Sequence, residues 1–144
     1  MFNRITFTWL CIFLGICLMP LSAAALDEKA KLNQLKPKAR KIFTEFIKQA
    51  RKQFPKHKII IAETYRTQDR QDKLFKKGSS TTTVRVSMHT KRLAADIYFI
   101  EDKKILAYEK APYLELGELG ESFGLRWGGR WSVPFDPGHY EVIQ

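Results

Sequence analysis

The spacing of apolar residues predicts a long helix followed by a buried strand. Apolar side chains recur at three- and four-residue intervals from Leu32 to Phe54, with lysine and arginine on the opposite face. This spacing predicts an amphipathic helix that begins near Pro37. Pro55 would end the helix, and the β-branched run at residues 58–64 predicts a buried β-strand directly after it.

The rest of the pattern predicts shorter elements separated by turn-forming residues. Thr67 suits the N-cap of a second helix, which Gly78 would end. The further predicted elements are an exposed loop at 78–83, strands at 93–100, 105–108 and 140–143, and a helix from 112 to 124. Helices mixed with hairpin strands are typical of the α+β class, here a small antiparallel sheet flanked by helices.

The N-terminal residues have the pattern of an export signal. Arg4 precedes an apolar run that extends from Ile5 to Leu21 and ends in small residues, so we expect cleavage after Ala25. The run is also long enough to approach a membrane span, which leaves an uncleaved anchor as the alternative. Cleavage would divide the chain into a signal peptide at 1–25 and one domain at 26–144, with no membrane anchor left in the mature protein.

Cysteine usage and net charge indicate the cellular compartment and the kind of partner. Both cysteines lie in the signal segment, so the mature domain would form no disulfide, which suits a bacterial envelope protein, secreted or periplasmic. The net charge is +10, and +9 without Arg4, which favours polyanionic partners. Export points to the cell wall or a membrane surface, and no nucleic-acid motif accompanies the basic residues. Alternatively, the excess lysine only keeps the protein soluble.

Two short stretches carry residues suited to metal chemistry. The first contains His89 and Asp96, and the second contains Asp136 and His139. Two imidazoles and two carboxylates can supply a zinc ion with one open coordination position and one spare base. The sequence Asp-Pro-Gly-His at 136–139 predicts a type II β-turn, which would bring its first and last Cα atoms within about 7 Å.

The spacing of His89 and Asp96 requires a bend between them. On a helix they would lie roughly 10 Å apart along the axis. On one straight strand they would face opposite sides of the sheet. We therefore expect the chain to fold back at residues 90–92, with the side chain of Ser87 supporting the bend by hydrogen bonding.

These motifs resemble the zinc D-Ala-D-Ala carboxypeptidase and L-alanyl-D-glutamate endopeptidase family of peptidoglycan peptidases, which includes phage endolysins. Residues 87–96 match the family pattern Ser-x-His-x-x-Gly-x-Ala-x-Asp, and residues 136–139 match its downstream acid-x-x-His. Tyr-Arg-Thr at 65–67, followed by Gln71, resembles the family's upstream element. Arg92 stands where the pattern has glycine, and we interpret this position as a bend with an ordinary backbone conformation.

The resemblance implies a Hedgehog/DD-peptidase-like single domain and a role for each matched residue. His89, Asp96 and His139 would bind zinc, which supplies an activated water. Asp136 would take the proton of that water and deliver it to the leaving amine. Arg66 would stabilise the oxyanion or bind a substrate carboxylate, or else serve as a structural ion-pair partner. Further residues expected to contact substrate are Gln71, Ser87, Trp127, Trp131 and Tyr140, with the tryptophans as core residues in the alternative interpretation.

The implied function is an exported zinc peptidase that acts on the stem peptide of peptidoglycan as a monomer. Cleavage between L-Ala and D-Glu is preferred to removal of a terminal D-Ala, because the compact chain is similar to the phage-type branch. The alternative is a basic, non-catalytic module of the same fold that binds the cell wall through its charge.

Overall fold

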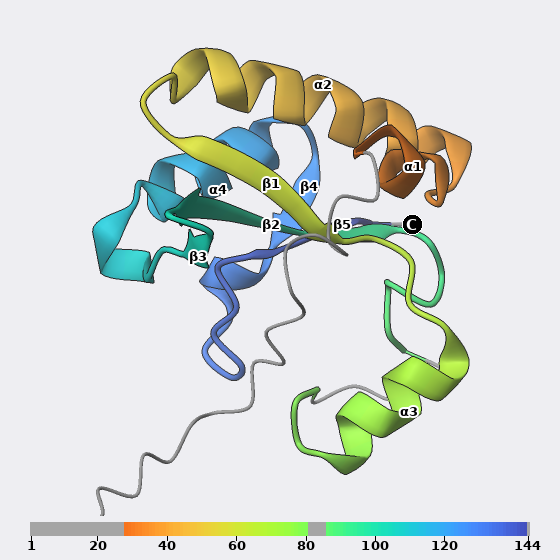
Figure 1. Ribbon diagram of the computed structural model, residues 1–144. Helices are drawn as coiled ribbons and strands as arrows, with labels where there is room; N and C mark the ends of the chain where they lie inside the picture. Colours follow the sequence, from red (N-terminus) through yellow and green to blue (C-terminus); the bar gives the residue numbers. More distant parts are fainter. Residues whose placement is uncertain (1–27, 81–85, 144) are drawn as a thin grey trace, which may run out of the picture.

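One antiparallel sheet organises the computed structural model, which describes residues 28–80 and 86–143 (Figure 1). Four of its strands run in the order β1-β2-β5-β4, and β3 pairs with the end of β2. The strands are β1 (Lys58–Glu63), β2 (Ala94–Glu101), β3 (Lys104–Ile105), β4 (Leu125–Trp127) and β5 (His139–Val142). The helices are α1 (Glu28–Asn33), α2 (Pro37–Gln53), α3 (Gln68–Lys76) and α4 (Tyr113–Ser122). The predicted α+β class is confirmed.

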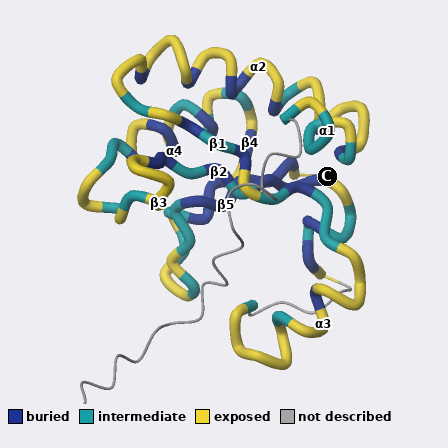
Figure 2. The backbone as a smooth tube through the Cα atoms, viewed as in Figure 1, coloured by how far each residue is buried: buried dark blue, intermediate teal, exposed yellow. Residues whose placement is uncertain are grey.

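The core lies between this sheet and the helices α2 and α4, whereas α3 projects on the other side (Figure 1). Phe43 and Phe46 of α2 are fully buried, and so is Leu116 of α4. Removing each such side chain from water contributes roughly 1.5–3 kcal/mol. The outer face of α2 remains exposed (Figure 2), as the predicted amphipathic pattern requires.

Side chains of the central strands alternate between the core and the opposite face of the sheet. Ile97 and Phe99 of β2 and Tyr140 of β5 belong to the core. The residues that alternate with them face a cleft, namely Asp96 and Tyr98 on β2 and His139 and Glu141 on β5. The two-residue period of the strands therefore sends polar side chains to one face and apolar ones to the other.

Most predicted boundaries agree with the structure. Thr67 caps α3, because its Oγ1 accepts a hydrogen bond from the Arg70 amide at 3.3 Å, and Gly78 follows with a φ of +69°. The return strand is shorter than predicted, with only the two residues of β3. Helix α1 and strand β4 were not predicted, since elements of six and three residues are too short to show a period.

Two predictions fall on residues that the structure does not describe. These are the export signal at 1–25 and most of the loop at 78–83. Among the described residues, no helix has the length and apolar character needed to cross a membrane.

Candidate metal centre and catalytic cleft

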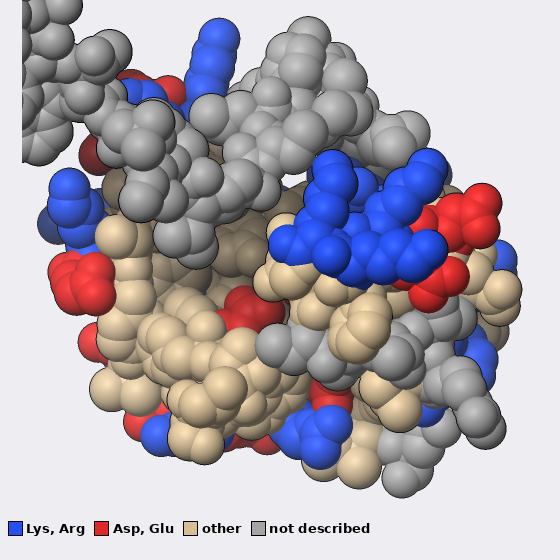
Figure 3. Space-filling model, turned by 90° about the horizontal axis from the view of Figure 1, so that it is seen from below, with Lys and Arg blue, Asp and Glu red and all other residues tan. Residues whose placement is uncertain are grey.

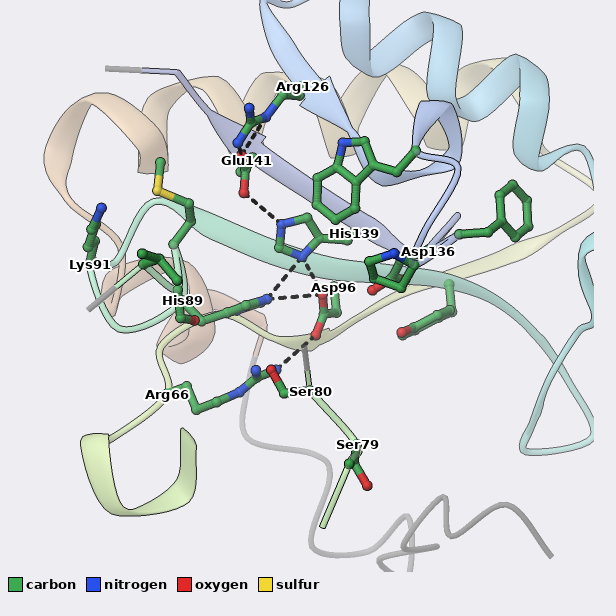
Figure 4. A pocket seen from close by; sticks show the side chains of 18 residues that line it. Arg66, Ser79, Ser80, His89, Lys91, Asp96, Arg126, Asp136, His139 and Glu141 are labelled. Atoms are coloured by element: carbon green, nitrogen blue, oxygen red, sulfur yellow. Dashed lines mark hydrogen bonds and ion pairs between the residues drawn. The ribbon is translucent and has the colours of Figure 1, made fainter. Parts of the chain in front are cut away.

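Neighbouring strands place the candidate ligands side by side. Asp96 on β2 is the direct cross-strand partner of His139 on β5. Arg126 on β4 pairs in the same way with Glu141, two residues beyond His139 on the cleft face of β5. His89 reaches the same place from the turn that precedes β2, and Figure 4 shows the three side chains converging.

Three candidate ligand atoms form a nearly equilateral triangle. Nε2 of His89 lies 3.1 Å from Oδ1 of Asp96 and 3.2 Å from Nδ1 of His139. The third side, from Nδ1 of His139 to Oδ1 of Asp96, is also 3.2 Å. A tetrahedral ion with ligand bonds of about 2.0–2.1 Å separates its ligand atoms by about 3.3–3.4 Å. The triangle therefore has the size that zinc requires.

The outward nitrogens of both imidazoles have acceptors, which turns the lone pairs of the inward nitrogens toward the triangle. Nδ1 of His89 donates to the Thr64 carbonyl at 2.7 Å, and Nε2 of His139 donates to Oε2 of Glu141 at 2.9 Å. Such partners fix the tautomer and the ring orientation of metal-binding histidines. The lone pairs of the two inward nitrogens and of the Asp96 oxygen repel one another at this separation unless a cation lies between them. The donor set therefore fits a metal ion.

Electrostatics keep Asp96 in its ligand form. Burial alone would raise the pKa of the Asp96 carboxyl. When the inward imidazole nitrogens carry protons in place of the metal, the charge of His89 and hydrogen bonds from both imidazoles hold that pKa well below its usual range. Burial likewise opposes the charging of His139, whereas hydrogen bonds to Asp96 and Glu141 raise its pKa to about 9. A proton and a metal ion therefore compete for Nδ1 of His139.

A turn positions His89. The Arg92 amide closes this turn by donating to the His89 carbonyl at 3.1 Å. The prediction of an ordinary backbone at Arg92 is wrong, because its φ of 61° lies in the left-handed region. Arg92 thus adopts a backbone conformation that glycine reaches at the least steric cost. Its guanidinium stacks on the Tyr65 ring, 4.7 Å from the ring centroid. The Ser87 carbonyl accepts from the hydroxyl of Thr90 at 2.8 Å, a bond that reinforces the bend.

A second turn brings Asp136 into the cleft. The His139 amide donates to the Asp136 carbonyl at 3.2 Å, which closes the expected four-residue turn. A type II turn needs a positive φ at its third residue, which here is Gly138. The φ of Gly138 is not positive, so the turn is not type II. Glycine is required there for space, since a Cβ on Gly138 would lie 2.1 Å from the Tyr98 ring.

Asp136 differs from Asp96 in its electrostatic setting. Burial raises the pKa of the Asp136 carboxyl, and the negative charge of Asp96 raises it further. A carboxylate with a raised pKa holds a proton more readily, as a general base must during turnover. The two carboxylates of the cleft are thus suited to different tasks.

Glu141 and Arg126 belong to the site although sequence analysis did not select them. Oε1 of Glu141 accepts from Nε of Arg126 at 2.6 Å, which leaves its Oε2 for His139. The Arg126 guanidinium lies over Trp131, whose ring also contacts the His139 ring at a centroid distance of 5.2 Å. A sequence signal existed, because residues 139 and 141 of one strand share a face.

Arg66 is fixed by carboxylates and an amide. Its Nε donates to Oε2 of Glu63 at 2.9 Å, its Nη1 donates to Oε1 of Gln71 at 2.8 Å, and its Nη2 lies 3.5 Å from Oδ2 of Asp96. The ion-pair alternative therefore describes Arg66 in this structure. Gln71 is fully buried beneath Arg66 and donates to Ser80 Oγ at 2.8 Å, so it supports the cleft wall instead of lining it.

Trp127 and Tyr140 do not line the cleft, which corrects the expectation that they contact substrate. The strand period turns both into the core, where Trp127 is 1 % and Tyr140 0 % exposed. Trp127 instead supports the second turn, since its Nε1 donates to the Pro137 carbonyl at 2.9 Å. Ser87 and Trp131 do lie at the cleft.

The cleft has a volume of about 640 Å³ and opens away from α2. Figure 3 shows it as a hollow with acidic side chains in its floor. Val86, Met88 and Phe135 add apolar surface to its walls. A volume in this range accommodates a small peptide or a molecule of similar size.

Comparisons with known proteins agree with this site. The family model described as D-alanyl-D-alanine carboxypeptidase matches residues 80–142, which include the three candidate ligands and Asp136. This match supports the resemblance to the zinc D-Ala-D-Ala carboxypeptidase and L-alanyl-D-glutamate endopeptidase family. The chain is a zinc-dependent peptidase, and His89, Asp96 and His139 are the residues that fit the ion.

Solved structures of similar fold include two kinds of peptidase. The L-Ala D-Glu endopeptidase ChiX of Serratia marcescens is 17% identical, with a TM-score of 0.63 over 81% of this chain and 86% of its own. The zinc complex of the D,D-pentapeptidase VanY from the VanB-type resistance cassette is 19% identical, with a TM-score of 0.56 over 76% and 73%. VanYB with D-alanine-D-alanine gives 20% identity and a TM-score of 0.55 over 76% and 72%. No curated protein sequence matches the chain.

Proposed function

We propose that this zinc peptidase hydrolyses an amide bond in the stem peptide of peptidoglycan. The observation that carries the proposal is the placement of Asp136 in one cleft with the His89, Asp96 and His139 triangle. The similarity to ChiX and VanY, whose names describe peptidases for such peptides, supports this class of substrate.

The residues of the cleft divide the work of hydrolysis. His89, Asp96 and His139 would hold a zinc ion, which would act as the Lewis acid that activates water. Asp136 accepts the proton of the attacking water as oxygen adds to the amide carbon, and it protonates the leaving nitrogen as the C–N bond breaks. Glu141 holds His139 in one orientation, and Arg66 holds the second oxygen of Asp96. Trp131 and Ser87 border the space for the peptide.

We propose the bond between L-Ala and D-Glu as the one that is cleaved. The chain covers a larger share of ChiX than of VanY, which supports an endopeptidase of compact size. Because peptidoglycan lies outside the cytoplasmic membrane, the proposal also requires export, as the N-terminal apolar run predicts.

Digestion of purified peptidoglycan sacculi tests the function. The zinc-loaded protein should release soluble fragments, and mass spectrometry should find a freed peptide that begins at D-Glu. Asp136→Asn should lower the rate by about 10²–10⁴-fold while keeping its zinc, because the general base is lost and the ligands remain. The matched control is Asp102→Asn, an exposed aspartate of the β2–β3 turn, which should retain full activity.

The products separate the alternatives. Loss of a terminal D-Ala would replace the proposed bond by a carboxypeptidase reaction. Retention of sacculi on the protein without any cleavage, unchanged by a chelator, would instead support a non-catalytic binding module.

A further inference from the structure

The positive charge of the chain is concentrated on α2 and the residues that flank it, far from the metal centre in the fold. Residues 36–58 contain nine lysines and arginines against the single acid Glu45, so they carry +8 of the net charge of +10. All nine basic residues are exposed. They are Lys36, Lys38, Arg40, Lys41, Lys48, Arg51, Lys52, Lys56 and Lys58.

Lysines form a stripe along α2 directly opposite its buried face. Lys38, Lys41, Lys48 and Lys52 recur at intervals of three, seven and four residues, which places them on one side of a helix. With a rise of 1.5 Å per residue, the stripe extends roughly 21 Å. We call these four residues the lysine stripe. One acid lies in it, Glu45, which is 3.6 Å from the Lys48 ammonium.

The arginines of α2 have a different use from the lysines. Arg51 forms a two-pronged ion pair with Glu28 of α1, and Nη1 of Arg40 donates to Asn33 at 3.2 Å. Both guanidinium groups thus join α1 to α2. The flexible ammonium groups of the lysine stripe point to solvent and supply a diffuse positive field without fixed hydrogen-bond geometry.

We propose that the lysine stripe binds a linear polyol-phosphate polymer of the cell wall. The proposal rests on the proposed function, which brings the protein to peptidoglycan and to the anionic polymers attached to it. A saturated phosphodiester chain offers repeated negative charge, and a row of lysines attracts it through the release of its counterions. Because the cleft opens away from α2, bound polymer would leave the cleft free and hold the enzyme beside its substrate (Figures 1 and 3).

The side chains around the stripe favour such a polymer over other polyanions. The exposed large apolar residues of the described chain all lie outside α2, so the helix offers nothing to insert into a membrane. Phe43 and Phe46 are buried, which leaves α2 no exposed aromatic ring for stacking the bases of single-stranded nucleic acid. Charge attraction is therefore the means by which the lysine stripe would bind a polymer.

The test uses the full protein and a fluorescent poly(glycerol phosphate), with binding measured by anisotropy at several salt concentrations. The triple variant Lys41→Gln, Lys48→Gln and Lys52→Gln should bind at least about tenfold more weakly in low salt. The slope of log K against log salt should fall by about 2, since each lost contact to a flexible chain removes about 0.7. Glutamine has a helix propensity close to that of lysine, so α2 should remain folded by circular dichroism.

Two matched variants locate the effect. Arginine at the same three positions keeps the charge and should bind like the original protein. Lys73→Gln, Lys76→Gln and Lys77→Gln remove an equal charge from the α3 region on the cleft side. At about 0.15 M salt, where screening acts over about 8 Å, this variant should keep its affinity within about twofold. Equal losses in both glutamine variants would overturn the proposal, because net charge alone would then explain the binding.

Comparison with other polyanions completes the experiment. Tighter binding to phosphatidylglycerol vesicles or to duplex DNA than to the polymer would also overturn the proposal. Cleavage of a soluble stem peptide distinguishes this proposal from the function it rests on. Unchanged cleavage without polymer binding refutes only the lysine stripe, whereas polymer binding through the stripe without cleavage refutes only the proposed peptidase reaction.

Discussion

The metal centre combines two regions that hold their residues by different means. Asp96, His139 and Glu141 stand on β2 and β5, where the backbone ladder sets their positions. The other region consists of turns and α3, and there Arg66 and Gln71 are held by side-chain hydrogen bonds. The strand residues, together with the ligand His89 from the turn before β2, should therefore control metal affinity, whereas the rest of the turn and helix region should control stability and the shape of the cleft wall.

Removal of a ligand from the strand region should have the largest effect. His139→Ala takes away one corner of the triangle. Zinc affinity should fall by more than about 100-fold, which exceeds the cost of losing a residue that only orients a ligand. Zinc content after desalting measures the effect. His57→Ala is the matched control, because His57 packs against Phe99 on the core side, and its variant should keep one zinc per chain. Full zinc content in His139→Ala would contradict the proposed ligand set.

Glu141→Gln should weaken zinc binding by about 10–100-fold without removing a ligand. A glutamine has one acceptor oxygen, so it cannot serve both His139 and Arg126 as the carboxylate does. Competition with a chromophoric chelator measures the affinity. Glu121→Gln also removes a carboxylate that pairs with an arginine, here Arg130. Because Glu121 lies on α4 and does not line the cleft, this variant should bind zinc normally. Equal affinities in the two variants would show that Glu141 does not position His139.

Gln71→Ala should affect stability but not zinc affinity. The buried amide bonds both Arg66 and Ser80, and its loss leaves partly buried polar groups without this partner, at a cost of about 1–3 kcal/mol. The midpoint of urea unfolding measures the change in the metal-free protein. Gln49→Ala, on the exposed face of α2, should change stability by less than about 0.5 kcal/mol. A Gln71→Ala variant that loses zinc instead would remove the contrast between the two regions.

The same contrast explains how far the sequence could predict the molecule. His89, Asp96 and His139 were found because a ligand pattern and a family resemblance marked them. Glu141 was within reach, because the period of a strand places it beside His139. Arg126 was not, since the three residues of β4 show no pattern and their pairing with β5 depends on the whole sheet.

Turns were predicted less well than strands because local sequence does not fix backbone angles. The Asp-Pro-Gly-His turn was located correctly, but the Tyr98 ring and the Trp127 indole, both distant in sequence, determine its shape. Trp127 itself was expected in the cleft, since a sequence does not reveal which face of a short strand an aromatic side chain occupies. At Arg92 the glycine of the family pattern was the available signal for a left-handed conformation.

Arg92 offers the smallest and most specific test of the turn region. Arg92→Gly relieves the strain of a φ of 61°, but glycine increases the entropy of the unfolded chain and the stacking on Tyr65 is lost. These effects oppose one another, so the free energy of unfolding should change by less than about 1 kcal/mol. Arg92→Val also loses the stacking and forces a β-branched residue into the left-handed region, which should cost roughly 1–3 kcal/mol. Urea unfolding of both variants compares them, and equal stability would mean that the turn before β2 tolerates another backbone conformation.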